Sequence, residues 1–542
     1  MMALRVVGRW VMLGLTGSGA LLAPPAHAAE VRVLVPSSAM HAIEGIDIGL
    51  DGSIYGTSIH GQAVYRIDPV SGRVSVVVPS PVGESDDVAV GPSGTAAVGI
   101  LAWTAQRSGE IRILRPGGKP EVILSNAPRV NPIAFNKQGR LFTAQSGAGE
   151  DALWELDVIG TKPPRVVAKN KGRLNGFGFG PDGKLYAPYF GTDKLFAIDV
   201  DTSAFTVIAE GVGTSAAVKV DKDGLVYSID YLLGELWRTD VAAKSSKMIA
   251  RFREPIDNLA IAADGTIYIS NVADSAVYAY NPKTGARRDV VRGLFSMTLG
   301  MSITKRDSRE ALIVADPFGY RYVDTVTGDV DRPFWAANRG ASSAVAENAR
   351  SIVYTYAGTN RVRKLDRQTD QLAFESTAVK APRGIALTSA GDVIVVDAEG
   401  GRIVKVTDSG VTDLATGLTK PIGLVLESDT VAWVTEFETG AVKRVDLSTG
   451  KTTELAKGLG KPTAVAVMKD GRLAVVESGL GRVSALDAKT GARTDLASGL
   501  ALSLEGLDLP QDANGGIAVG RDGTIYVSCP GNNSIVAITP GA

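Results

Sequence analysis

The feature that most constrains this chain is an internal repeat of 41 to 45 residues. The stretch GLDGSIYGTSIHGQAVYRIDPVSGRVSVVV shows the pattern, in which short apolar segments alternate with turns that contain Gly and Asp. The turns used to align the repeats lie at Asp51, Ser93, Gln138, Asp182, Asp223 and Asp264. A repeat of this length that holds four short strands is typical of one blade of a β-propeller.

A second and less regular series of six repeats follows the first. Its blades begin near Thr298, Ser343, Arg383, Ile422, Thr463 and Gly515. Twelve repeats are too many for one ring, because propellers usually contain about four to eight blades. The high Gly count and the short runs of Val, Ile, Thr and Tyr suit many short strands joined by tight turns. The sequence therefore predicts an all-β fold of two tandem six-bladed β-propellers, built from four-stranded antiparallel blades.

The N-terminus has the pattern of a secretory signal peptide. Arg5 and Arg9 precede an apolar run that ends in the small-residue sequence Ala26-His27-Ala28. An N-terminal membrane anchor is the alternative, but the apolar run is short for a membrane span. We expect a periplasmic or secreted protein with no membrane insertion after signal removal. The predicted ranges are the signal peptide at 1–29, an N-terminal propeller at 30–285 and a C-terminal propeller at 286–542.

The two ends of the chain indicate how the rings close. The segment VRVLV at 31–35 resembles a fourth strand with no blade before it, and the last repeat stops after SIVAI without a fourth strand. We expect 31–35 to close the sixth blade, which leaves RRDVV at 287–291 free to close the twelfth, so that no sheet edge stays open. The domain boundary then falls near 284–286, and a boundary one strand later, near Met297, is the alternative.

Composition limits the classes of function. The chain has 57 Lys and Arg against 58 Asp and Glu, so no excess of basic residues points to nucleic acid as a partner. Cys529 is the only cysteine, which excludes an internal disulfide, and we expect it to be buried in a late strand. After signal removal the histidines are His41 and His60. Each is a candidate ligand contact or, alternatively, a solvated or locally hydrogen-bonded side chain.

Polar residues recur seven positions before the turns of the first series. The residues at this offset are Glu44, Asp86, Asn131, Asn175, Ala216 and Asp257. Because the innermost strands of a propeller line its central channel, five oxygen-bearing side chains should converge on one small volume at its end. Each of them alone could instead satisfy local backbone groups at a turn or strand end. As a group, the carboxylates would repel one another unless a cation or protons neutralise them.

The same offset in the second series yields no carboxylate. The residues there are Arg383, Ile422, Thr463 and Gly515, with Thr298 and Ser343 at the less regular starts. We therefore expect the first ring to carry the candidate site, and the second to be a scaffold, a partner surface or a lid. The insertion ALSLEGLDLPQDANG at 501–515 is either a lid or a long loop.

Three segments of the first series resemble the calcium-binding strands of a known superfamily: IEGIDIGLDGSIYG, VNPIAFNKQGRLFTA and LNGFGFGPDGKLYAP. They are similar to strands of the SMP-30/gluconolactonase/LRE-like superfamily of six-bladed β-propellers, which is related to paraoxonase. The resemblance implies that a divalent cation, calcium, is held at the end of the channel. The metal ligands it implies in this chain are Glu44, Asn131, Asn175 and Asp257.

The chain departs from the family pattern in the position of its acids. The family's Asp normally lies in the fifth blade, where Ser215 and Ala216 stand here, whereas Asp257 is in the sixth blade and Asp86 adds an acid in the second. In the chemistry that the resemblance implies, Ca²⁺ polarises a carbonyl or phosphoryl oxygen, and Asp257 or Asp86 is the catalytic residue that activates water or attacks directly. The expected function is an exported calcium-dependent hydrolase of a lactone or related small-molecule ester.

The alternative function is an exported, non-catalytic, NHL-like propeller that binds a protein or a small-molecule partner. Propeller loops form broad surfaces, and loops commonly carry recognition. On the second propeller, Phe334 and Trp335 are candidates for contact with a protein partner, although such residues more often pack between blades. A quinone-dependent oxidoreductase is a third possibility and ranks last, because the Trp-rich blade repeats of that class are missing.

Overall fold

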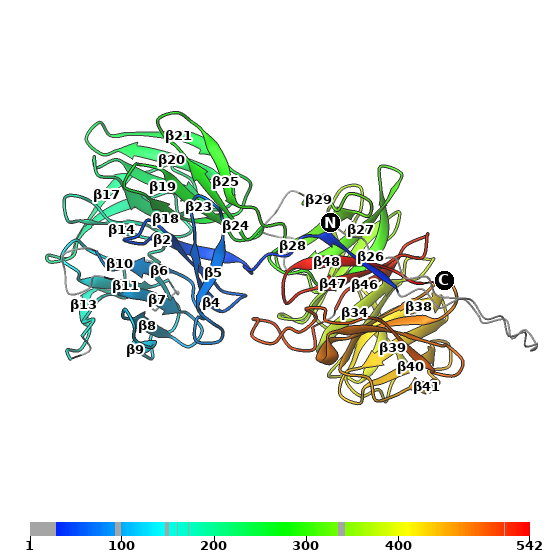
Figure 1. The fold of residues 1–542 in the computed structure, drawn as a ribbon. Helices are drawn as coiled ribbons and strands as arrows, with labels where there is room; N and C mark the ends of the chain where they lie inside the picture. Colours follow the sequence, from blue (N-terminus) through cyan, green and yellow to red (C-terminus); the bar gives the residue numbers. More distant parts are fainter. Residues whose placement is uncertain are drawn as a thin grey trace, which may run out of the picture.

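The computed structural model describes residues 29–92, 99–146, 151–159, 161–171, 173–333, 342–513 and 515–541. These residues form twelve four-stranded antiparallel sheets and one short 3-10 turn at Ser478–Leu480 (Figure 1). The predicted all-β fold of four-stranded blades is confirmed. In this part of the chain, no helix is long and apolar enough to cross a membrane. Residues 1–28 of the predicted signal peptide, Phe334 and Trp335 lie outside the described residues.

The first propeller is a closed ring of six blades. Its first blade contains β2 (Ile43–Ile48), β3 (Ile54–Ser58), β4 (Ala63–Ile67) and β5 (Val74–Val78), ordered from the channel outward. The innermost strands of the next five blades are β6 (Val88–Val90), β10 (Val130–Phe135), β14 (Gly178–Phe179), β18 (Ser215–Val220) and β22 (Ile256–Ile261). Each innermost strand contacts the next, and β22 contacts β2, so the ring is complete.

The second propeller repeats this arrangement. Its innermost strands are β26 (Met301–Arg306), β30 (Ala344–Glu347), β34 (Pro382–Leu387), β38 (Pro421–Ser428), β42 (Pro462–Val467) and β46 (Ile517–Val519). These strands also contact one another in order, and β46 contacts β26. Figure 1 shows the two rings side by side, the first coloured blue to green and the second green to red.

The strand that closes the second propeller comes from the N-terminus. β1 (Glu30–Val35) pairs antiparallel with β48 (Ser534–Thr539), whereas β25 (Arg287–Val291) pairs with β24 (Ala276–Tyr280) in the sixth blade. The prediction that 31–35 closes the sixth blade and 287–291 the twelfth is therefore wrong. Both sheets can accept one more strand at the outer edge, and the alternation in VRVLV does not specify which edge it joins.

This closure places the first and the last strand of the described chain in the second propeller. After β1 the chain crosses to build all six blades of the first ring, and it then returns to build the second. In Figure 1 the blue β1 lies beside the red β48. Since β25 belongs to the sixth blade, the pairing fits the alternative boundary near Met297 better than one at 284–286.

Hydroxyl side chains on the second strands of blades connect neighbouring innermost strands. Thr57 Oγ1 donates a hydrogen bond to the carbonyl oxygen of Asp86 at 2.6 Å, which links the first blade to the second. Ser270 Oγ donates to the carbonyl oxygen of Glu44 at 2.5 Å, which links the sixth blade back to the first. These bonds fix the backbone at the start of the innermost strands, where the polar residues of the channel lie.

The two propellers contact each other directly through the segment that leads into the first blade. Asn533 Nδ2 donates to the carbonyl oxygen of Met40 at 2.9 Å, and His41 Nε2 lies 2.8 Å from the carbonyl oxygen of Pro530. Arg321, which is fully buried in the second ring, donates from Nη2 to the carbonyl oxygen of Ala273 at 2.6 Å. Buried hydrogen bonds of this kind hold the rings in one relative arrangement.

Candidate functional site in the channel of the first propeller

β-bulges place the candidate residues at the end of the channel. The pairing register shifts between Ile43 and Ile46 in the first blade, between Val130 and Ile133 in the third, and between Ile256 and Leu259 in the sixth. A bulge sets two residues opposite one on the partner strand and turns their side chains away from the regular alternation. The bulged pairs are 44–45, 131–132 and 257–258, so the offset of seven residues selects equivalent places in these blades.

The same register shift occurs in the second ring between Pro382 and Ile385, and between Pro421 and Leu424. Arg383 and Ile422 therefore stand where Glu44 and Asn131 stand in the first ring. These positions of the two rings are therefore equivalent within their blades. At this position of the innermost strand, the second ring has the cationic side chain of Arg383, whereas the first ring has acids such as Glu44.

Asp86 is held by two amide side chains. Asn131 Nδ2 donates to Asp86 Oδ1 at 2.6 Å, and Gln106 Nε2 donates to Asp86 Oδ2 at 2.9 Å. Gln106 was not predicted as a site residue, because it lies outside the seven-residue offset, just beyond β7 (Leu101–Ala105). Asn131 contacts Asp86 through its amide nitrogen, so its side-chain oxygen is not used in this contact. The structure thus brings two of the predicted site residues into direct contact.

Glu44 has an unsatisfied carboxylate oxygen. Its Oε2 is inaccessible to solvent and has no hydrogen-bond partner among the described residues, although the residue as a whole is half-buried. Burial, followed by the charges of Asp86, Asp257 and Asp87, raises the pKa of Glu44 well above its ordinary value. An orphaned buried carboxylate oxygen costs free energy unless a proton or a cation reaches it.

A second layer of polar residues lies beside the first. Asn258 Nδ2 donates to Asp87 Oδ1 at 3.1 Å, and Asp87 Oδ2 also accepts from the backbone nitrogen of Ile133 at 3.2 Å. Burial raises the pKa of Asp87 to about 6, and burial together with the charge of Asp87 raises the pKa of Asp257 to about 7. Asp87 was missed by the sequence analysis, although the doubled acid in SDDVAV is a visible signal.

Asn175 and Tyr231 complete the description of the channel end. Asn175 Oδ1 accepts a hydrogen bond from the backbone nitrogen of Gly176 at 2.9 Å, which is the local role expected of an isolated Asn. Tyr231 follows β19 (Val226–Asp230), and burial and the charges of Asp257 and Glu44 raise its pKa. Tyr231 was also missed, because its position on the second strand of a blade falls outside the offset.

Lys219 is a nearby cation at a deeper level of the ring. Its Nζ donates to the carbonyl oxygen of Phe177 at 2.8 Å, and its charge lowers the pKa of both Asp87 and Asp47 against the effect of burial. Among the described residues, Lys219 is not one of the main charges that shift the pKa of Glu44, Asp86 or Asp257.

The donor set fits a hard cation in its chemistry. Carboxylate and amide oxygens are the ligands that calcium prefers, and the orphaned Glu44 Oε2 offers one such oxygen. Among the described residues, however, no group of three or more His, Cys, Asp or Glu side chains is already arranged to hold a metal ion. The predicted ligands Glu44, Asn131, Asn175 and Asp257 therefore stay a prediction, as do Asp86 and Asp257 as catalytic residues.

The two histidines lie at the contact between the rings. Burial lowers the pKa of His41 to about 4, and its Nε2 lies against Pro530. His60 Nδ1 lies 3.8 Å from Asp508 Oδ2 of the second propeller. Cys529 is buried as predicted, and burial raises the pKa of its thiol to about 11. Neither histidine contacts the channel carboxylates directly by a hydrogen bond in the described structure.

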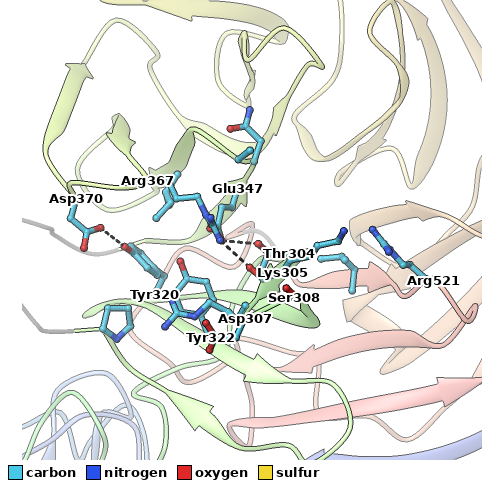
Figure 2. Close-up of a pocket in the computed structure, with 16 residues that line it drawn as sticks. Thr304, Lys305, Asp307, Ser308, Tyr320, Tyr322, Glu347, Arg367, Asp370 and Arg521 are labelled. Atoms are coloured by element: carbon cyan, nitrogen blue, oxygen red, sulfur yellow. Dashed lines mark hydrogen bonds and ion pairs between the residues drawn. The ribbon is translucent and has the colours of Figure 1, made fainter.

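A large cavity lies elsewhere, in the second propeller. It has a volume of about 730 Å³ and is bounded by residues of the seventh and eighth blades, with Arg521 at one side (Figure 2). Thr304 Oγ1 donates to Glu347 Oε2 at 2.9 Å, and Tyr320 donates to Asp370 at 3.2 Å. Among the described residues, those that line this cavity all belong to the second propeller. We place the candidate site in the channel of the first propeller because buried carboxylates interact there, although the cavity of the second propeller has a large volume.

Comparisons with known proteins add little to this description. No family model matches the chain, and no curated protein matches it. Among solved structures, a chain from one titled "Crystal structure of Nidogen/Laminin Complex" is similar at 17% identity and a TM-score of 0.37. The similarity covers 41% of this chain and 85% of that chain. We draw no conclusion from it, and the fold rests on the twelve sheets themselves.

Proposed function

We propose that the first propeller binds a divalent cation, calcium, at the end of its channel and uses it to hydrolyse a lactone or related ester. The single observation that carries the proposal is the buried Oε2 of Glu44, which has no hydrogen-bond partner among the described residues, while burial and the charges of Asp86 and Asp257 raise the pKa of this carboxyl group. We also propose, from the signal peptide predicted at 1–29, that the protein is exported to the periplasm or secreted.

The residues of the chain have distinct parts in this proposal. Glu44, Asn131, Asn175 and Asp257 would hold the ion, and bound calcium would stabilise negative charge on a carbonyl oxygen of the substrate. Asp86, oriented by Gln106 through a 2.9 Å hydrogen bond, would accept the proton of the attacking water. Asp257 is the other candidate for this base. The Asn258–Asp87 hydrogen bond would keep the second layer fixed beneath them.

The experiment that tests the proposal is a thermal melt of residues 30–542, first in chelator and then in excess calcium. A ligand that binds only the folded state stabilises it by about 2.7 kcal/mol at a concentration 100-fold above its Kd. We expect a clear rise in Tm that Asp257→Ala abolishes, as does Glu44→Gln combined with Asn175→Ala. Asp264→Asn, which removes an exposed acid seven residues away, should keep the full rise. Lactones and esters are then screened for product release.

The alternative is a non-catalytic exported propeller with a polar channel. The observation that favours it is that part of the channel is already satisfied by protein groups, since Asn131 and Gln106 donate to Asp86 and Asn175 accepts from Gly176. In that case calcium causes no rise in Tm, and the purified protein contains no metal. This pair of results would remove the hydrolase and leave a binding protein whose partner contacts the loops of either ring.

A further inference from the structure

The long insertion before the last blade is an ordered strap. Residues 501–513 connect β45 (Arg493–Ala497) to β46 and are described throughout. Leu504 and Ala513 are buried in an apolar cluster of the second propeller that includes Met297 and Tyr320. Apolar side chains at both ends of the segment therefore fix it to its own ring. We call residues 501–513 the strap.

The strap is fastened at the channel of the second propeller by a buried ion pair. Arg383 Nη2 lies 2.9 Å from Asp512 Oδ1, and Arg383 Nε donates to the carbonyl oxygen of Asp512 at 3.0 Å. Lys420 Nζ lies 3.6 Å from the other carboxylate oxygen. Arg383 occupies the position that Glu44 has in the first ring, so the channel end of the second ring serves as an anchor for the strap.

The middle of the strap reaches the first propeller. The backbone nitrogen of Asp508 donates to the carbonyl oxygen of His60 at 2.8 Å. The Asp508 carboxylate is buried and forms an ion pair with Arg107, and it lies 3.8 Å from His60 Nδ1. Both partners lie in loops that join the second and third strands of their blades, in the first and second blades of the first ring.

Each of these two partners is linked to a channel carboxylate through neighbouring residues. Arg107 follows Gln106, whose amide donates to Asp86 at 2.9 Å. His60 precedes Gly61, whose backbone nitrogen donates to the carbonyl oxygen of His41 at 3.2 Å, three residues before Glu44. Asp508 is thus connected by short paths to both Asp86 and Glu44, from a different propeller.

We propose that the candidate site is built by both propellers, and that Asp508 of the strap is a positioning residue that forms part of the mouth of the first channel. It holds the Arg107 loop next to Gln106, and it neutralises the Arg107 guanidinium, which would otherwise repel a divalent cation. This inference rests on the proposed function for its effect on calcium binding. On this inference, the second ring contributes a residue to the site of the first ring. The channel of the second ring has no such site of its own among the described residues, because Arg383 and Asp512 pair at its end.

The electrostatics agree with this geometry. Asp508 is among the charges that raise the pKa of Glu44. Asp508 and Arg107 also act in opposite directions on Tyr356 of the second ring, whose pKa is raised mainly by burial. Buried charges such as the Asp508 carboxylate interact more strongly with other buried groups, because little water lies between them. Exposed charges are instead screened over about 8 Å at physiological salt.

Calcium affinity of the full chain, measured by isothermal titration calorimetry with CaCl₂ alone, tests the inference. Asp508→Asn removes one negative charge and leaves Arg107 unpaired, so we expect calcium binding to weaken by about three- to tenfold. Adding Arg107→Gln to Asp508→Asn restores the local net charge and should return most of the affinity. Glu505→Gln removes the same charge from an exposed position on the same strap and should change nothing.

A second measurement, made without metal, tests whether Asp508 holds the loops of His60 and Arg107 in place. In the calcium-free chain, amide hydrogen exchange around His60 and Arg107 should become faster in Asp508→Ala than in Glu505→Ala. Equal exchange, or equal calcium affinity in Asp508→Asn and Glu505→Gln, would overturn the inference and leave the proposed function standing. If the unmodified chain binds no calcium, the proposed function fails, and the exchange result alone decides whether the strap forms the mouth.

Discussion

Asn258 of the sixth blade donates a hydrogen bond to Asp87 of the second blade at 3.1 Å, although the first blade stands between them in the ring. Gly45 makes this contact possible. A Cβ at position 45 would lie 2.5 Å from both Cα and Oδ1 of Asp87 and 2.7 Å from the carbonyl oxygen of Asp86. Because Gly45 has no side chain, it leaves room for Asp87 of the second blade to approach Asn258 of the sixth blade.

Gly45→Ala is expected to destabilise the first propeller and to displace Asp86 and Asp87. The new methyl group meets backbone atoms that belong to another blade and cannot rotate away, and overpacking of this kind costs about 1–3 kcal/mol. Chemical unfolding in urea measures the loss. Gly118→Ala is the matched control, because position 118 is exposed and its nearest neighbour would be the Arg115 carbonyl oxygen at 3.3 Å. A change in stability as small as that of the control would contradict the packing argument.

In chelator, the protein is expected to lose stability as the pH rises from 6.5 to 8. The pKa of Asp257 is about 7 in the folded chain, well above the ordinary Asp value, so the folded state binds more protons than the unfolded state in this window. Stability is then highest below this pKa and falls on the order of 1 kcal/mol as Asp257 ionises. Urea unfolding at several pH values measures the slope.

Asp257→Asn is the variant that isolates this effect, because it keeps the shape and removes the ionisation. Its stability should vary less between pH 6.5 and 8 than that of the unmodified chain. Measurements stay above pH 6.5 because burial lowers the pKa of His41 to about 4, and this group removes stability as the pH falls below its ordinary value of 6.5. An identical pH slope in both proteins would mean that Asp257 does not titrate as described.

Because β1 closes the second ring, a single substitution in β1 is expected to lower the stability of the second propeller strongly. Val35 is completely buried opposite Ile535, so Val35→Asp places an unpaired charge inside the last blade and should cost more than about 3 kcal/mol. Val31→Asp is the control, since Val31 lies on the same strand and is 45% exposed. Amide exchange should increase in β48 and not in β24. Faster exchange in β24 instead would favour closure of the sixth blade.

Removing Arg383, which anchors the strap through Asp512, should also lower the stability of the second propeller, in this case because a buried ion pair is broken. Arg383→Met leaves the buried Asp512 carboxylate with only Lys420 at 3.6 Å, and breaking a buried ion pair by removing one partner costs about 3–5 kcal/mol. We expect the remaining Lys420 contact to reduce this to about 2–3 kcal/mol. Arg472→Met, which removes an exposed pair with Asp470, should change stability by less than about 0.5 kcal/mol. Equal losses in the two variants would show that the anchor contributes little.

Much of the candidate site was predictable because a propeller repeats one local structure. The bulges at 44–45, 131–132 and 257–258 lie at equal distances from the turns, so a fixed offset in the sequence finds them. The offset does not reach Gln106 or Tyr231, which belong to the ends of second strands. Their contacts with the channel carboxylates depend on the packing of neighbouring strands, which a local repeat in the sequence does not show.

The sequence by itself determined the blades, their number and the polar residues at the starts of the innermost strands, since these follow from local periodicity and turn chemistry. Only the tertiary structure decided where β1 pairs and where the strap lies. Two open sheet edges compete for β1 with the same backbone hydrogen bonds, and the choice depends on the relative placement of the two rings. Asp508 and His60 are likewise 448 positions apart in the chain (508 − 60), and only the contact between the propellers brings them together.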